Sequence, residues 1–249
     1  MDFLNKQLEG YIEDHSTKEN DLLSEINRET WAKVLMPRML SGHIQGRVLS
    51  LLSNLTKPSN IIEIGTYTGY SALCLAEGIK KNGELHTIEI NEEHAAIAKK
   101  FFEKSKFSKI IKQHIGEAIN IINKIEKKFQ LAFIDADKEN YSNYFDLLID
   151  KIDINGIIIA DNVLWSGKVI NDEKDHETQE LDSYNKKIDD KTQKELVFDE
   201  YPHEVDKGEF VTFSSGKRMA KWYNEASGNG HLRSKTFPGI AKAMADQWG

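Results

Sequence analysis

Residues 61–71 read Ile-Ile-Glu-Ile-Gly-Thr-Tyr-Thr-Gly-Tyr-Ser, an apolar run that leads into two glycines four positions apart. The apolar run predicts a buried strand, and the glycines predict a tight turn before the helical pattern that follows. Glycine permits such a turn and lets the backbone approach a ligand closely. The spacing G-x-x-x-G differs from the G-x-G-x-x-G of dinucleotide-binding folds, and no Lys-Ser/Thr pair follows as in a P-loop. Pyrophosphate is therefore a poor candidate ligand for this loop.

The order of strand, turn and helix repeats along the chain after this first unit. The expected strands are 61–64, 84–90, 109–115, 130–134 and 156–160, and the expected helices are 70–79, 91–104, 116–125 and 141–151. Consecutive strand–helix units of this kind form a parallel sheet with helices on both faces. The sequence therefore predicts an α/β fold built on a single doubly wound, mostly parallel sheet.

The two ends of the chain differ from this repeating middle. Apolar side chains before Pro58 recur at helical spacing, which predicts N-terminal helices. A helix is expected near 181–188, and the apolar runs 196–198 and 210–213 predict an antiparallel C-terminal strand pair. No linker divides the chain, so we expect a single domain over residues 1–249, made of a helical segment, a core and a tail: 1–57, 58–213 and 214–249.

The composition limits the partners of this 249-residue chain. Its 40 acidic and 33 basic side chains give a net charge of −7, which argues against nucleic acid as the main partner. No apolar run is long enough to span a membrane, and the N-terminus lacks the features of a signal peptide. The single cysteine, Cys74, fits a reducing compartment. We therefore expect a cytoplasmic protein that binds neither membrane nor nucleic acid.

Two acidic residues near the glycine turn favour a positively charged nucleoside as ligand. Glu63 precedes the turn, where a carboxylate would repel a phosphate but attract a cation. Glu89 ends the second expected strand, where an acidic side chain can accept hydrogen bonds from ribose hydroxyls. Together these features predict S-adenosylmethionine (SAM), with a tight turn and two surface acids as the plainer alternative.

Polar side chains follow the fourth and fifth expected strands. Asp135 follows one apolar run, and Asp161 and Asn162 follow the next. The carboxyl ends of neighbouring parallel strands meet at one edge of a sheet, which brings three hard oxygen donors together. Such donors suit Mg²⁺, and also Mn²⁺ or Ca²⁺. Helix capping and an Asx turn are the plainer interpretations of these residues.

The nearby Lys138 adds a group that a pure metal site does not need. A divalent cation that binds two vicinal oxygens lowers the pKa of a hydroxyl and orients it. Lys138, with its own pKa lowered by these surroundings, could then take the proton. The resulting oxyanion would attack a sulfonium methyl group in line, a reaction that depends mainly on positioning.

The chain resembles the cation-dependent O-methyltransferases of the caffeoyl-CoA and catechol group, from about residue 5 to residue 190. The resemblance is carried by six runs: MLSGHIQGRVL at 39–49, IIEIGTYTGYSAL at 61–73, HTIE at 86–89, GEA at 116–118, FIDADKENY at 133–141 and ADNVLWSG at 160–167. It implies the Rossmann-like fold of class I methyltransferases and methyl transfer to one hydroxyl of a catechol-like small molecule, including a caffeoyl-type acceptor. It also implies a homodimer in which the N-terminal segment 1–57 serves as lid and dimerisation element.

The resemblance also implies roles for individual residues. Asp135, Asp161 and Asn162 would bind the metal, and Lys138 and Asp135 would be catalytic. The SAM site would consist of Met39, Ser41, Glu63, Gly65, Tyr67, Gly69, Ser71, Glu89, Gly116, Ala118, Asp135 and Asp137.

The tail departs from the family. Members usually end with a hairpin that carries a proline-isoleucine-arginine-aspartate-glycine run, and no such run follows Lys191. Two alternatives to the metal-dependent reaction therefore stay open. One is a metal-independent small-molecule methyltransferase, and the other is a non-catalytic SAM-binding protein whose site the tail has altered.

Overall fold

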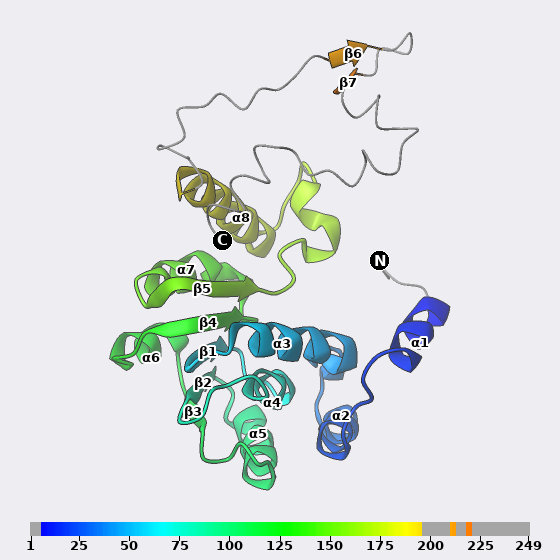
Figure 1. The fold of residues 1–249 in the computed structure, drawn as a ribbon, viewed down its shortest axis with the longest axis vertical. Helices are drawn as coiled ribbons and strands as arrows, with labels where there is room; N and C mark the ends of the chain where they lie inside the picture. The colour runs from blue at the N-terminus through cyan, green and yellow to red at the C-terminus, as the bar shows by residue number, and fades with distance from the viewer. Residues whose placement is uncertain (1–5, 196–209, 213–217, 221–249) are drawn as a thin grey trace. The chain divides into compact units, whose positions relative to one another are not determined.

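The computed structural model describes residues 6–195, 210–212 and 218–220. The chain divides into two units, Met1–Asp190 and Lys191–Gly249, which we describe separately. The first unit contains a five-stranded sheet in the order β3-β2-β1-β4-β5 (Figure 1). Every pairing in this sheet is parallel. The predicted doubly wound α/β fold is confirmed.

The strands of this sheet are short and mostly apolar. They are β1 (Asn60–Ile64), β2 (Glu84–Glu89), β3 (Ile111–Ile115), β4 (Phe129–Ile134) and β5 (Ile152–Ala160). In the register, Ile64 lies opposite Ile134 of β4, and Ile134 lies opposite Ala160 of β5. β1, β4 and β5 therefore end at nearly the same level, which brings the residues that follow them to one edge of the sheet.

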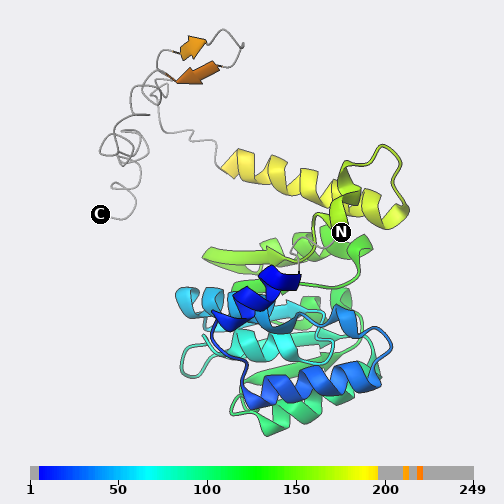
Figure 2. The same cartoon turned by 90° about the vertical axis from the view of Figure 1, so that its right-hand side faces the viewer.

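Helices cover both faces of the sheet (Figures 1 and 2). Side chains alternate along β1, so Ile61 packs on one face and Ile62 on the other. The face of Ile61 packs against α2 (Asp21–Lys33), α3 (Gly42–Thr56), α4 (Tyr70–Ala76) and α5 (Glu92–Lys104). The face of Ile62 packs against α6 (Ala118–Lys124), α7 (Tyr141–Ile149) and α8 (His176–Glu195). Burial on both faces explains the continuous apolar runs of the strands.

The remaining short elements connect these layers. α1 (Lys6–Asp14) begins the described chain, and the 3₁₀ helices η1 (Pro37–Met39), η2 (Lys138–Asn140) and η3 (Trp165–Ile170) precede α3, α7 and α8 respectively. Asn91 caps α5 as its sequence predicts, because its side chain accepts hydrogen bonds from the amides of Glu93 and His94.

Several element boundaries differ from the sequence prediction: α8, for example, extends beyond the predicted 181–188 at both ends, and β3 begins at Ile111 rather than at residue 109. α4 ends at Ala76 rather than at residue 79, because the backbone at Gly78 lies directly against α3. A Cβ at Gly78 would come within 2.2 Å of the carbonyl carbon of Ser53. β5 begins at Ile152, earlier than the predicted residue 156, and its pairing with β4 is irregular near its start. Asn155 in that stretch has a φ of 64°, a backbone conformation outside the β region. The Asn-Gly pair at this point reads as a turn in the sequence, so the earlier part of the strand is not predicted.

In the second unit, β6 (Phe210–Thr212) and β7 (Arg218–Ala220) form an antiparallel two-stranded sheet. The predicted strand at 210–213 is therefore present, but its described partner is 218–220. Strands separated by so few residues can pair as a hairpin. The predicted strand 196–198 lies outside the described residues, as does most of the tail 214–249. The predicted single domain and its three segments stay a prediction.

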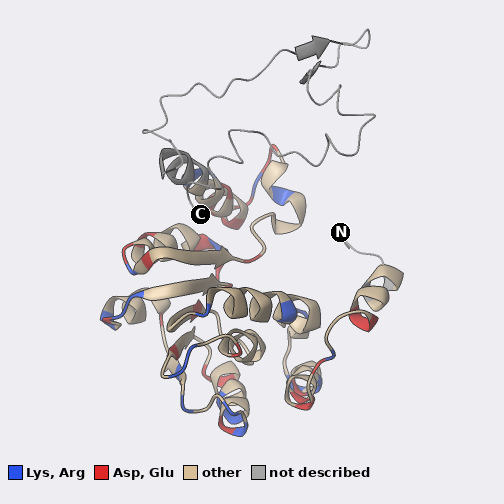
Figure 3. Cartoon of the chain, in the orientation of Figure 1, with Lys and Arg blue, Asp and Glu red and all other residues tan. Residues whose placement is uncertain are grey.

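Charged side chains of both signs occur on the same helices of the first unit (Figure 3). On one face they join two helices, since Lys104 of α5 pairs with Glu25 of α2 at 2.6 Å. Lys100, one turn earlier, pairs with Glu29. In the part of the chain that the structure describes, no helix is long and apolar enough to cross a membrane.

Candidate active site

The ends of β4 and β5 place two of the predicted site residues side by side. The amide of Asp135 donates to the carbonyl oxygen of Ile64 at 2.9 Å, and the amide of Asp161 donates to that of Ile134 at the same distance. These bonds continue the sheet's ladder one residue beyond the strands. Asp135 and Asp161 are therefore fixed on neighbouring strand ends by backbone bonds.

Gly65 makes this arrangement possible because the backbone of Asp135 lies against its Cα. A Cβ at position 65 would come within 1.9 Å of the carbonyl oxygen of Asp135. Gly65 also has a φ of +98°, which favours glycine. The close neighbour of Gly65 in this structure is therefore the strand end of β4, and its predicted approach to a ligand stays a prediction.

The candidate metal donors form a cluster of negative charge. Burial, together with the nearby negative charge of Asp161, raises the pKa of Asp135 to about 6. Asn162 is exposed and has a φ of 58°, a conformation that asparagine tolerates well. Among the described residues no group of three or more His, Cys, Asp or Glu side chains could hold a metal ion. The candidate set therefore reaches three donors only with the amide oxygen of Asn162.

Lys138 is buried beside these carboxylates, with only 6% of its surface exposed. Its Nζ lies 3.6 Å from Oδ1 of Asp135 and donates to the backbone oxygen of Asp161 at 3.2 Å. It also donates to the hydroxyl of Tyr141. Burial lowers the pKa of Lys138, although the charges of Asp135 and Asp161 oppose this. A buried lysine with a lowered pKa is suited to accept a proton.

Glu63 is completely buried in β1, on the same strand that leads to the glycine turn. One of its oxygens, Oε2, accepts a hydrogen bond of 2.5 Å from the hydroxyl of Thr87 on β2. The other, Oε1, is buried without a hydrogen-bond partner in the described structure. Burial raises the pKa of Glu63 to about 8, so the carboxyl group is mainly neutral at pH 7.

The raised pKa of Glu63 predicts a pH-dependent contribution to stability. Because the pKa is higher in the folded state, stabilisation by the neutral carboxyl is complete below the unfolded pKa of 4.5 and is lost as pH rises through about 8. The free energy of unfolding of the wild type should therefore fall relative to that of Glu63→Gln between about pH 5 and about pH 9. Urea denaturation of both proteins across this range measures the difference, and parallel curves would contradict the assignment.

Glu89 lies at the end of β2 with its carboxylate held by the backbone. The amide of Tyr67 donates to Oε2 at 2.6 Å, and the amide of Asn91 donates to Oε1 at 2.9 Å. Each carboxylate oxygen can accept more than one hydrogen bond, so both can still receive a ligand hydroxyl. The side chain of His94 lies 4.0 Å from Oε1 and packs edge-on against Tyr67.

The other predicted cofactor residues lie along the same edge or on the elements that begin there. Gly69 is the N-cap of α4, Ser71 lies in its first turn, and Ala118 begins α6. The amide of Gly116 donates to the carbonyl oxygen of Glu89 at 2.8 Å. The carboxylate of Asp137 accepts hydrogen bonds of 2.5 Å from both Asn140 and Tyr144.

Met39 and Ser41 come from the N-terminal segment. Hydrogen bonds tie this segment to the glycine turn, and one of them runs from the hydroxyl of Thr30 to that of Thr68 at 2.9 Å. The hydroxyl of Tyr67 donates to the backbone oxygen of Met36 at 2.8 Å. Tyr67 itself has a φ of 50°. η1, which contains Met39, therefore lies next to the loop that follows β1.

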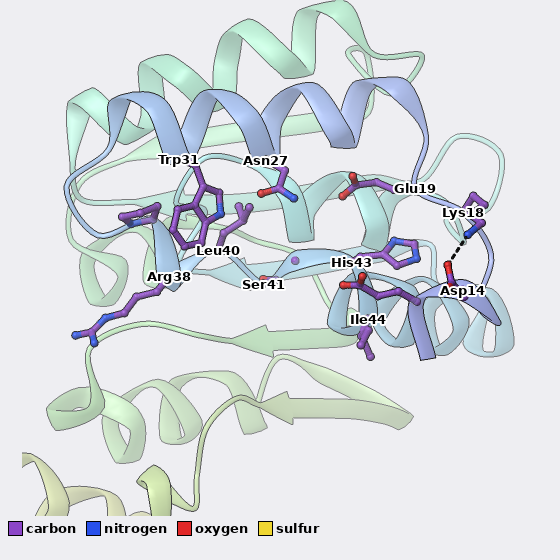
Figure 4. Close-up of a pocket in the computed structure, with 13 residues that line it drawn as sticks. Asp14, Lys18, Glu19, Asn27, Trp31, Arg38, Leu40, Ser41, His43 and Ile44 are labelled. Atoms are coloured by element: carbon purple, nitrogen blue, oxygen red, sulfur yellow. Dashed lines mark hydrogen bonds and ion pairs between the residues drawn. The ribbon is translucent and has the colours of Figure 1, made fainter. Parts of the chain in front are cut away.

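A cavity of about 690 Å³ lies within the N-terminal helices. Figure 4 shows Trp31 and Arg38 at one end of it and Glu19, His43 and Lys18 at the other. Ser41 lines this cavity, whereas Asp135, Lys138 and Asp161 do not. The cavity is therefore separate from the cluster of strand-end residues.

Sequence reasoning missed two groups that shape the site. Thr87 supplies the hydrogen bond to Glu63, and its signal was a polar residue inside a buried strand. Tyr141 contacts Lys138, whereas the sequence marks it only as the first residue of an expected helix and the last of the run 133–141. Neither role could be assigned without knowing which side chains face one another across the sheet.

The protein has an α/β fold, and this fold places the strand-end carboxylates at the carboxyl edge of a parallel sheet. A family model described as O-methyltransferase matches residues 13–198. The chain belongs to this O-methyltransferase family, and it is a methyltransferase.

Two curated relatives illustrate the similarity. A catechol O-methyltransferase from Niastella koreensis is 34% identical over 172 residues, which cover 67% of this chain and 77% of that protein. A caffeoyl-CoA O-methyltransferase from Medicago sativa is 33% identical over 159 residues, which cover 61% of this chain and 64% of the plant protein. The chain thus spans slightly less than two thirds of that plant relative.

Solved structures give the same result. An O-methyltransferase from Bacillus cereus in complex with S-adenosylhomocysteine (SAH) is 30% identical, with a TM-score of 0.70 over 74% of this chain and 86% of that one. TomG from Streptomyces achromogenes, an O-methyltransferase involved in tomaymycin synthesis, was solved with SAM. It is 26% identical, with a TM-score of 0.70 over 74% of this chain and 84% of its own.

Proposed function

We propose that the protein is a SAM-dependent and divalent-metal-dependent O-methyltransferase that methylates one hydroxyl of a catechol-like small molecule. The observation that carries this proposal is the cluster of Asp135, Lys138 and Asp161 at adjacent strand ends. It combines oxygen donors for a cation with a buried amine that can take a proton.

The residues around the glycine turn are proposed to bind SAM. The buried and unpartnered Oε1 of Glu63 would gain a partner from a positively charged group of the ligand. Such a cation would also lower the pKa of Glu63 and favour its ionised form. Glu89, already oriented by two backbone amides, would accept hydrogen bonds from ribose hydroxyls. Gly65, Tyr67, Gly69, Ser71, Gly116, Ala118 and Asp137 would complete the walls, with Met39 and Ser41 above them.

Asp135, Asp161 and Asn162 are proposed to hold the cation, with Mg²⁺ favoured over Mn²⁺ or Ca²⁺. The fit rests on the donors themselves, since burial and the repulsion from Asp161 together raise the pKa of Asp135. A bound cation would relieve this repulsion. When bound, it would supply Lewis-acid chemistry that lowers the pKa of a substrate hydroxyl.

Lys138 is proposed to accept the proton of that hydroxyl. Its low exposure and lowered pKa favour the neutral form of the amine, which can accept a proton. With the proton held at Nζ, the substrate oxygen would be free to accept the methyl group that SAM supplies, and SAH would be the leaving group. The protein's share of this step is orientation, because the two reactants must be in line.

The acceptor class rests on the relatives, which include a catechol and a caffeoyl-CoA O-methyltransferase. A homodimer is also proposed, because several large apolar side chains of the N-terminal segment are exposed, including Trp31 (63%), Leu35 (97%) and Met39 (59%). The cytoplasmic location predicted from the sequence stays a prediction.

Methyl transfer from SAM to 3,4-dihydroxybenzoate tests the proposed function, together with calorimetric titration of SAH. We expect SAH to bind and a monomethylated catechol to appear by mass spectrometry. SAH binding without turnover on this substrate or on caffeoyl-CoA would instead favour a non-catalytic SAM-binding protein. The absence of both would contradict the proposal altogether.

A further inference from the structure

Tyr141 is a completely buried residue at the start of α7, and its hydroxyl lies between parts of two strand ends. The hydroxyl accepts a hydrogen bond from Nζ of Lys138. It is 3.1 Å from the backbone oxygen of Asp161, to which it can donate, and 3.3 Å from that of Ile134. One hydroxyl thus touches the candidate base and the backbone of a candidate metal ligand.

These contacts fix the direction of the Lys138 amine. A lysine ammonium carries three N–H donors. The hydroxyl of Tyr141 and the backbone oxygen of Asp161 take two, and the ion pair with Asp135 attracts the third. Nζ also lies 4.4 Å from the centre of the Tyr141 ring. Tyr141 therefore contacts this amine with its ring and also supplies one of its three polar partners.

The position of the hydroxyl is itself fixed by packing. The ring of Tyr141 packs edge-on against Tyr184 of α8, with centroids 5.5 Å apart. Tyr144, one turn along α7, directs its own hydroxyl to the carboxylate of Asp137 instead. The two tyrosines of one helix therefore serve different residues, and only Tyr141 reaches Lys138 and Asp161.

We propose that Tyr141 is a positioning residue of the methyl-transfer reaction, whose hydroxyl holds Nζ of Lys138 and the backbone of Asp161 in one arrangement. This inference rests on the proposed function, because it assigns Tyr141 a task only if Lys138 takes the substrate proton. The proposed role does not require Tyr141 to contact SAM or the acceptor. Removal of the hydroxyl should therefore lower the rate of the step and leave ligand binding unchanged.

The first test compares Tyr141→Phe with the matched control Tyr184→Phe, which removes a hydroxyl from the ring packed against Tyr141. We expect Tyr141→Phe to lower kcat on 3,4-dihydroxybenzoate about 10- to 100-fold, the usual loss for groups that orient a site. The KM for SAM and the Kd for SAH should stay within about twofold of wild type. These constants change when an interaction with the bound ligand is lost, and the hydroxyl of Tyr141 is not proposed to make one. Tyr184→Phe should keep wild-type values.

A second measurement is independent of turnover. Trace labelling with acetic anhydride, read by mass spectrometry at Lys138, reports how tightly the buried amine is held. We expect labelling of Lys138 to increase in Tyr141→Phe and to stay unchanged in Tyr184→Phe. A third test introduces Tyr141→Phe into Lys138→Ala, where it should have little further effect on kcat because it acts through the missing amine.

The outcomes separate the two proposals. If the wild type methylates no catechol, the proposed function fails. If the wild type is active and Tyr141→Phe equals it in kcat and labelling, the positioning role of Tyr141 is wrong. An equal loss of kcat in the presence and absence of Lys138, or a Tyr141→Phe protein that does not fold, would show a merely structural hydroxyl and also overturn the inference.

Discussion

Replacement of Asp161 by alanine is expected to lower the turnover of catechols by about 10²- to 10³-fold. Lewis-acid stabilisation by a bound cation contributes several kcal/mol to the transition state, and each 1.36 kcal/mol corresponds to a tenfold change in rate. The substitution removes a candidate metal ligand but keeps the backbone oxygen that accepts hydrogen bonds from Lys138 and Tyr141. The loss should therefore come from the missing carboxylate rather than from a displaced base.

Asp150→Ala is the matched control for this substitution. Asp150 is an exposed carboxylate close to the opposite end of β5, so its loss changes the net charge equally and leaves the strand-end cluster intact. We expect wild-type turnover in Asp150→Ala and an SAH affinity close to wild type in both variants. Initial rates at saturating Mg²⁺, with calorimetry of SAH, measure these quantities. Near-normal turnover in Asp161→Ala would remove Asp161 from the proposed metal site.

Replacement of Lys138 by alanine is the second substitution with a large expected effect. General-base catalysis by a positioned side chain contributes about 10²- to 10⁴-fold to a rate, and we expect a loss of kcat in this range. The Kd for SAH should change little, because the contacts of Lys138 are with Asp135, Tyr141 and Asp161. Single-turnover rates with bound SAM measure the chemical step directly.

Lys104→Ala provides the control for the loss of a lysine. Lys104 is partly exposed on α5, where it pairs with Glu25 of α2 and takes no part in the strand-end cluster. Its removal should leave kcat unchanged, since exposed ion pairs contribute little even to stability. If Lys138→Ala, shown to be folded by circular dichroism, retained wild-type kcat, another group would have to accept the proton.

Much of the fold could be predicted because the buried strands are continuous apolar runs. β1 and β4 are mostly apolar, and their parallel direction follows from the repeated strand–helix order. The exact start of β5 could not be predicted, because Asn155 and Gly156 interrupt its pattern like a turn. The partner of β6 could not be predicted either, since Arg218–Ala220 is a short run that lacks the continuous apolar pattern of a strand.

The candidate site could be predicted as far as it depends on strand ends. Asp135 and Asp161 meet because two parallel strands end at one level, a consequence of topology that the sequence already contains. The hydrogen-bond partners of buried side chains could not be predicted in this way, because they depend on which side chains face one another in space. The contact of Thr87 with Glu63 and that of Tyr141 with Lys138 join different elements or strand ends, and no spacing rule in the sequence predicts them.

Metal dependence is the central claim, and chelation tests it most directly. Methyl transfer from SAM to 3,4-dihydroxybenzoate should be measured with the metal-free protein in EDTA and again after excess Mg²⁺ is added, with SAH binding measured in both states. The account predicts that turnover falls by at least about 100-fold in EDTA and returns with Mg²⁺, while SAH still binds. Turnover that continues unchanged in EDTA would contradict it and favour a metal-independent methyltransferase.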